Sequence, residues 1–154
     1  MNPTQTPQAP QTPQATNPPD PAYGMTRHLP HLSVAEARER ITTSLRGEGF
    51  GILTEIDVRA TLQQKLGEEF RPYVILGACN PKLAHKALQA ELGMGLLLPC
   101  NVCVWQEGDG AVVSIVRPEA MFSVVNRPGL EALVKEATDG LSRALAALDQ
   151  PVAH

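Results

Sequence analysis

The residues with the most distinctive chemistry stand in a dipeptide that occurs twice, as Cys79-Asn80 and as Cys100-Asn101. A cysteine can act as a nucleophile or bind a soft metal, and it does both as the thiolate. An asparagine side chain offers hydrogen-bond donors and an acceptor. Each pair falls at the edge of a predicted regular element, where a site can form. These four residues are therefore the first candidates for ligand binding or reactivity.

Cys79 is the sharpest candidate because it directly precedes a predicted helix. Asn80 followed by Pro81 is typical of an N-cap with proline at the first helical position. The unpaired N–H groups and partial positive charge at such a helix end stabilise a thiolate, so the placement predicts a lowered pKa for Cys79. The alternative is that Cys79 packs as a small hydrophobic residue, as buried cysteines commonly do.

Cys100 follows Pro99, where we expect a bend in a strand, and Asn101 can satisfy backbone groups at that bend. If the strands that carry Cys79 and Cys100 are neighbours, the two thiols lie close, although a disulfide needs Cα atoms within ~7 Å. Cys100 and Cys103 match the C-x-x-C pattern, but strand residues three apart point to opposite faces, so we do not expect a redox pair. The spacing of a zinc site is absent from the sequence, and we expect no metal centre.

Glu55 is the acidic candidate for a site. Glu55 and Asp57 are two apart in a predicted strand and would share a face, as an acid–base pair requires. Asp57 is also the expected N-cap of the next helix, which disfavours a catalytic pair. The sequence contains no Gly-rich phosphate loop, nucleophile elbow or recognisable triad. It leaves open whether the chain is an enzyme and specifies no cofactor.

Composition divides the chain into two parts. Residues 1–21 hold half of the 14 prolines, and Asp20 is their one charged side chain. Such a segment buries too little apolar surface to offset its ordering entropy, so we expect a disordered tail of Pro, Gln and Thr. Residues 22–154 have the length of a single domain.

Charge and cysteine content indicate which classes of partner are disfavoured and which cellular compartment to expect. The net charge is −3 and the Lys and Arg residues are scattered, which argues against nucleic acid or an anionic membrane as the main partner. The sequence has neither a secretory signal nor an apolar run near the ~20 residues that span a membrane. Three cysteines, an odd number, are typical of a cytoplasmic protein with free thiols.

Apolar periodicity and turn residues predict the elements of the domain. Helices are expected after the capping residues Ser33, Asp57 and Asn80, and after Gly129. Strands are expected at 22–30, 50–56, 73–79, 96–105 (interrupted at Pro99) and 111–116. Strands bunched in the middle of the chain with helices at both ends favour an α+β fold, an antiparallel sheet with helices on one face.

Three segments of the chain resemble, in order and spacing, the domain-of-unknown-function 302 family of bacteria and archaea: Gly-Phe-Gly-Ile-Leu-Thr-Glu-Ile-Asp, Leu-Gly-Ala-Cys-Asn-Pro-Lys-Leu-Ala and Gly-Leu-Leu-Leu-Pro-Cys-Asn-Val. The resemblance covers about residues 22–148. It implies a TBP-like fold with a curved antiparallel sheet, and a homodimer, but no established activity. A shared architecture does not imply DNA binding. The chain departs from the family pattern at Cys103, where an aliphatic residue is usual, and in its Pro-rich tail.

Two functional hypotheses follow. The first is a small-ligand-binding or interaction module that acts as a homodimer, with a pocket near Cys79 and Cys100. Cys103 and Trp105 alternate with valines, so the sheet face away from the helices is also apolar, and a second subunit would cover it. The alternative is a thiol-dependent enzyme or redox sensor that uses Cys79, with Cys100 as its resolving partner.

Overall fold

Five antiparallel strands form one open sheet in the computed structural model, which describes residues 20–125 and 127–150. The spatial order is β1-β5-β4-β3-β2, so the first strand pairs with the last. Gly24 lies opposite Val116, and Leu29 lies opposite Ala111. The strands are β1 (Gly24–Leu29), β2 (Gly51–Asp57), β3 (Tyr73–Cys79), β4 (Cys100–Glu107) and β5 (Gly110–Val116).

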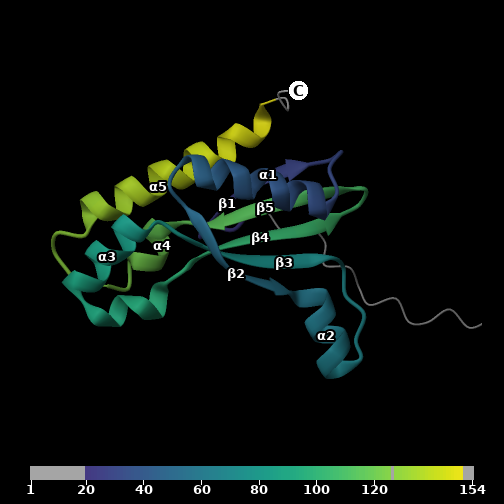
Figure 1. Ribbon diagram of the computed structural model, residues 1–154, viewed down its shortest axis with the longest axis horizontal. Coiled ribbons are helices and arrows are strands. Elements are labelled where there is room, and N and C mark those ends of the chain that lie inside the picture. Colours follow the sequence, from purple (N-terminus) through teal and green to yellow (C-terminus); the bar gives the residue numbers. More distant parts are fainter. Residues whose placement is uncertain (1–19, 126, 151–154) are drawn as a thin grey trace, which may run out of the picture.

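The helices confirm the predicted α+β class. Figure 1 shows α1 and α5 side by side on one face of the sheet, with α3 and α4 gathered at one end. At the other end α2 projects away from α1 and α5 (Figure 1). The helices are α1 (Val34–Gly47), α2 (Val58–Leu66), α3 (Pro81–Ala90), α4 (Pro118–Phe122) and α5 (Glu131–Ala146), with 3-10 turns η1 (Leu92–Leu97) and η2 (Ala147–Asp149).

Side-chain caps begin three of the helices, as the sequence predicts. The hydroxyl of Ser33 accepts a hydrogen bond from the backbone N–H of Glu36 at 3.1 Å, and the Asp57 carboxylate accepts one from Ala60 at 2.9 Å. The Asn80 side-chain oxygen accepts from two N–H groups of α3, at 3.1 and 3.3 Å. Each cap satisfies donors that a helix N-terminus otherwise leaves without a partner.

The fourth predicted strand is wrong over its first part. Residues 92–97 form the 3-10 helix η1, and β4 begins at Cys100 after a cis peptide bond between Leu98 and Pro99. The run Leu96-Leu97-Leu98 is apolar without any period, so the sequence gives no basis for choosing strand over helix there. Helix α4 was not predicted, since five residues are too few to show helical periodicity. The predicted disordered tail falls almost entirely on residues 1–19, outside the described residues.

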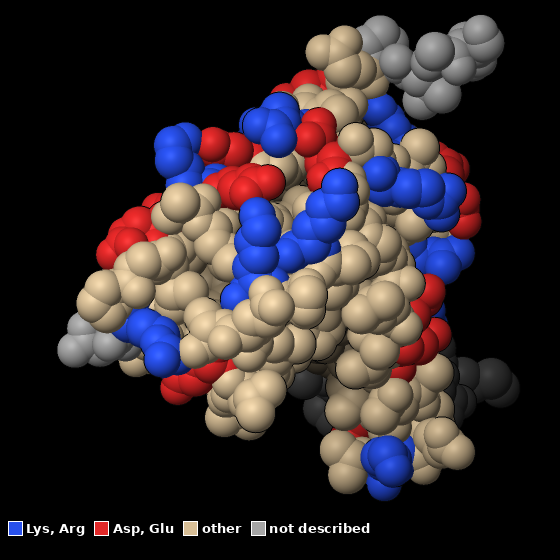
Figure 2. All heavy atoms as spheres, turned by 60° about the vertical axis from the view of Figure 1, so that its left-hand side comes forward, with Lys and Arg blue, Asp and Glu red and all other residues tan. Residues whose placement is uncertain are grey.

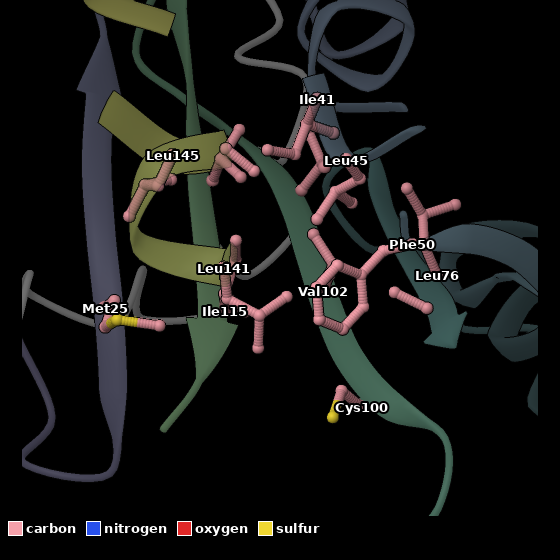
Figure 3. Packing of buried hydrophobic residues seen from close by; sticks show 14 of the residues in the cluster. Met25, Ile41, Leu45, Phe50, Leu76, Cys100, Val102, Ile115, Leu141 and Leu145 are labelled. Atoms are coloured by element: carbon pink, nitrogen blue, oxygen red, sulfur yellow. The ribbon is translucent and has the colours of Figure 1, made fainter. Parts of the chain in front are cut away.

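The core lies between the sheet and the pair α1 and α5. Figure 3 shows Ile41 and Leu45 of α1 and Leu141 and Leu145 of α5 directed at the same face of β4 and β5. All four leucine and isoleucine side chains are at most 2% exposed. Burying each one contributes about 1.5–3 kcal/mol relative to exposure. This face of the sheet is therefore sealed by the chain's own helices.

Within residues 20–125 and 127–150, no helix combines the length and apolar character that a membrane crossing needs.

Gly77 lies at a crowded point between β3 and its neighbours, and its substitution tests that packing. A Cβ at this position would overlap the Thr54 hydroxyl and lie 2.7 Å from Cγ of Pro99. We expect Gly77→Ala to lower the free energy of unfolding by about 1–3 kcal/mol, the usual cost of overpacking, as measured by urea denaturation. Gly51→Ala is the control, because nothing lies within 4 Å of its Cβ position. Equal stability of wild type and Gly77→Ala would contradict the packing described.

Candidate functional site

The sheet has a second face, opposite α1 and α5, which we call the open face. Side chains along each strand alternate between the two faces. In β4, for example, Val102 and Val104 are fully buried under the helices, whereas Cys103 and Trp105 face the other way and are partly exposed. By this alternation and the strand register, the open face carries Thr26, His28, Val112, Ser114, Asn101, Cys103, Trp105, Glu107, Tyr73, Ile75, Cys79, Thr54 and Ile56.

Three aromatic side chains form a cluster at one end of this face. The rings of Tyr73 and Trp105 are stacked, with centroids 5.5 Å apart and planes 9° from parallel. Phe70 lies 6.2 Å from Tyr73 in a tilted arrangement. Burial, and then a hydrogen bond with Cys103, raise the pKa of Tyr73. This aromatic cluster (Phe70, Tyr73 and Trp105) is a rigid apolar platform at the surface.

The edge of the sheet beside the cluster is apolar and poorly covered. Leu53 is 66% exposed and Ile56 is 49% exposed, both on the edge strand β2. Helix α2, which follows β2, has no buried residue, and its Leu66 is largely exposed. A nine-residue helix is marginal in water by itself, and helices normally gain their stability by burying an apolar face. The described chain thus gives β2 and α2 only part of the packing they need.

Cys79 and Cys100 lie on adjacent strands but on opposite faces of the sheet. The residue opposite Cys100 is Ala78, so Cys100 shares the helix-covered face with Ala78, and it is buried in the core (Figure 3). Cys79 is the next residue of β3 and therefore belongs to the open face, where it is partly exposed. The register brings the two residues near each other along the sheet, but their side chains point to opposite faces.

The pKa of Cys79 is raised by burial, the opposite of the shift predicted from its place before a helix. The Asn80 side-chain oxygen accepts hydrogen bonds from the N–H groups of Lys82 and Leu83 at this helix end. Burial, with a smaller contribution from Cys79, raises the pKa of Cys100 to about 11. Burial also raises the pKa of Cys103, although its contact with Tyr73 acts the other way.

The remaining predicted site residues do not converge. Asn80 is a helix cap, and Asn101 lies exposed on the open face, opposite Gly77 in β3. Glu55 accepts hydrogen bonds from the Arg38 guanidinium of α1 at 3.0 and 3.2 Å, on the helix-covered side. Cys79 and Asn101 therefore share one face, while Cys100 and Glu55 belong to the other. Side-chain alternation along each strand was available from the sequence, but the strand register that relates the strands was not.

A pocket of about 440 Å³ lies elsewhere, between α4, the loop after it and α5. Its lining includes the apolar Phe122, Leu130 and Val134. Three charged side chains of its lining form ion pairs: Lys135 pairs with Asp139 at 2.6 Å, and Arg127 pairs with Glu91 at 3.7 Å. Sequence reasoning missed this pocket. The one signal was the helical spacing of Glu131, Val134, Lys135, Thr138 and Asp139 along α5.

Over the part of the chain that the structure describes, no three His, Cys, Asp or Glu side chains gather as metal ligands would. His28 has two carboxylate neighbours: its Nδ1 lies 3.3 Å from a Glu107 oxygen, and its Nε2 lies 3.5 Å from an Asp20 oxygen. These contacts place Asp20 beside His28, at the edge of the open face.

Comparison with known proteins identifies relatives of this chain. The family model described as "Domain of unknown function DUF302" matches residues 25–148. A crystal structure of an uncharacterized conserved DUF302 protein from Bacillus stearothermophilus is 31% identical, with a TM-score of 0.75 over 82% of this chain and 98% of that one.

Two curated relatives are 29% identical over 101 residues, which is 65% of this chain: fluoride-specific ion channel FluC 1 of Brucella suis and FluC 2 of Brucella melitensis. The match covers only 39% and 37% of those two proteins. The similarity therefore concerns well under half of each relative.

The raised pKa of Cys100 predicts a loss of stability in alkali. The buried thiol changes its pKa from 9.0 to about 11 on folding, so the unfolded chain loses this proton first as the pH rises. At about 1.4 kcal/mol per pKa unit, we expect about 2–3 kcal/mol of stability, fully present below pH 9, to be lost as the pH rises through 11. Urea denaturation at several pH values measures this slope.

Cys100→Ala should flatten the pH dependence of stability, whereas Cys79→Ala should change it less because Cys79 is more exposed. An unchanged slope in Cys100→Ala would show that Cys100 is not the group responsible.

Proposed function

This chain belongs to the DUF302 family, and from that premise we propose that it is an interaction module that acts as a homodimer through its open sheet face. The observation that carries the proposal is that part of this face is apolar yet uncovered by the chain's own helices. The Tyr73–Trp105 stack, Ile75 and Ile56 all belong to it. Exposed apolar surface of this extent commonly marks a contact with another protein.

The size of the face suits a second copy. Five strands at about 4.8 Å spacing and seven residues at about 3.3 Å give a sheet face of roughly 550 Å². A stable interface buries about 800 Å² on each partner. The apolar side chains of β2 and α2, which projects on the open-face side, supply the remainder (Figure 1).

Charge also favours self-association of this face. Among the described open-face residues of the strands, the ionisable side chains other than thiols and Tyr73 are His28 and Glu107, which contact each other at one corner. Two copies related by a two-fold axis would therefore meet without repulsion between like charges.

On the surface seen in Figure 2, Lys and Arg side chains are intermingled with Asp and Glu, and the lower part carries mostly uncharged residues. A phosphate-binding surface requires a cluster of basic residues instead.

For the small-ligand part of the proposal, the pocket between α4 and α5 has better support than the surroundings of Cys79. Its volume of about 440 Å³ lies within the range of ligand sites, roughly 300–1,000 Å³. Its apolar lining of Phe122, Leu130 and Val134 beside the hydroxyl-bearing Ser123 and Thr138 suits a small, largely apolar molecule with one or two polar groups.

The thiol-dependent alternative has less support. Its nucleophile, Cys79, is accessible, but burial raises its pKa and so lowers the thiolate fraction at neutral pH. Its proposed resolving partner, Cys100, is buried on the other face of the sheet. Slow reaction of Cys79 with a thiol reagent at neutral pH is consistent with the binding module and inconsistent with the enzyme.

Light scattering after size exclusion tests the homodimer. We expect the mass of two chains at micromolar concentration, and we expect Ile56→Glu to weaken the dimer at least tenfold, because it places a charge in the apolar interface. Leu92→Glu is the matched control: Leu92 is 85% exposed but lies on η1, outside the strands that form the open face. A clean monomer of the wild type, or equal weakening by both variants, would contradict the proposed interface.

Native mass spectrometry of freshly purified protein tests the ligand pocket. We expect a small molecule to be retained by the wild type and lost in Val134→Trp, since the larger ring fills the pocket. Glu136→Trp serves as the control, because Glu136 is exposed on the same helix but does not line the pocket. Wild-type protein that carries no added mass, or loss of the molecule in both variants, would argue against this site.

A further inference from the structure

The described chain begins on the open face of the sheet. The backbone N–H of Gly24 donates to the Pro21 carbonyl at 2.9 Å, which closes a turn directly before β1. A Cβ on Gly24 would lie 3.0 Å from the Ser114 hydroxyl and 3.2 Å from the Pro21 ring. Pro21 therefore lies over the open face, since Ser114 belongs to that face.

From Pro21 the chain runs back along β1, toward the aromatic cluster. Asp20 contacts His28, four residues further along β1 than Gly24, with 3.5 Å between Oδ1 and Nε2. His28 begins a row of side chains across the open face: it lies opposite Val112, which lies opposite Trp105, which lies opposite Tyr73. Asp20, the first described residue, thus lies at the end of the open face that carries the aromatic cluster.

The preceding residues have the chemistry that such a cluster binds. Pro7, Pro10 and Pro13 are spaced three apart, and a polyproline II helix has three residues per turn, so the three rings would align along one edge. Grooves lined by aromatic side chains recognise Pro-rich segments in this conformation. Residues 1–19 carry no charged side chain that would oppose docking on an apolar surface.

The length of the segment also fits. At about 3.1 Å per residue, the seven residues from Asp20 back to Pro13 span about 22 Å. The row from His28 to Tyr73 crosses three strand spacings, about 14 Å. The segment is thus longer than the row, and Pro13 and Pro10 reach Trp105 and Tyr73 of the same chain when residues 14–19 bend, without any rearrangement of the sheet.

We propose that the N-terminal segment docks in cis, as a polyproline II helix, on Trp105 and Tyr73 of the open face. The docking does not require a dimer. It does compete with one, because the docked segment covers the aromatic end of the surface that a second copy would use. The proline segment thereby regulates self-association in the same chain.

Trp105 is the single tryptophan of the chain, so its fluorescence reports on the docking site directly. We expect acrylamide to quench Trp105 at least twofold more strongly in a variant that lacks residues 1–19 than in the full chain. A synthetic peptide of residues 1–19 should restore protection to the truncated protein. The full-length variant P7A/P10A/P13A should behave like the truncated one, whereas Q8A/Q11A, which alters the residues between the prolines, should remain protected.

The quenching measurements are made at a protein concentration where light scattering detects a single oligomeric species. They are repeated in Ile56→Glu, the variant that weakens the dimer. If the segment docks in cis, the weakened dimer leaves the protection of Trp105 unchanged. Equal quenching of the full and truncated chains, or of P7A/P10A/P13A and wild type, would overturn the proposal. In Ile56→Glu, where the dimer is weakened, protection that grows with protein concentration would also overturn it, because the segment would then be bound by another copy.

Discussion

The sheet of this protein carries apolar side chains on both faces, and its own helices cover only one of them. On the covered face, α1 and α5 seal a continuous core against β4 and β5. On the open face, the Tyr73–Trp105 stack and Ile75 remain partly exposed, flanked by an edge strand and by a helix, α2, with no buried residue. Apolar surface in contact with water is unfavourable, so we expect the open face to bind another apolar surface. The homodimer and the docked N-terminal segment are two ways of satisfying this single constraint.

The sequence predicted the elements well where local chemistry specifies them. Ser33, Asp57 and Asn80 begin helices because each side chain accepts a hydrogen bond from an N–H group only two or three residues away. The leucines at 96–98 were misassigned because an apolar run without a period fits several structures. The antiparallel α+β class was also predictable, since strands bunched in sequence favour hairpins and nearby pairing.

The arrangement of the candidate site was less predictable, because it depends on strand register. The sequence left open whether Cys79 and Cys100 lie close together. Their strands are neighbours, but a single residue of register places the thiols on opposite faces. Tyr73 and Trp105 are 32 positions apart, and their pairing was not predicted because nothing local relates them. Asn80 was recognised as a cap, but the burial that raises the pKa of Cys79 depends on how the strands and helices pack and was not predicted.

The pairing of the first strand with the last has a consequence for synthesis on the ribosome. Residues 24–29 pair only with residues 111–116, and α1 packs against α5, so the first third of the domain has no complete partner until most of the chain has been made. Until then the apolar side chains of Met25, Ile41 and Leu45 cannot be buried in their native contacts. Contacts between such distant parts of a chain slow folding and leave apolar segments open to association in the meantime.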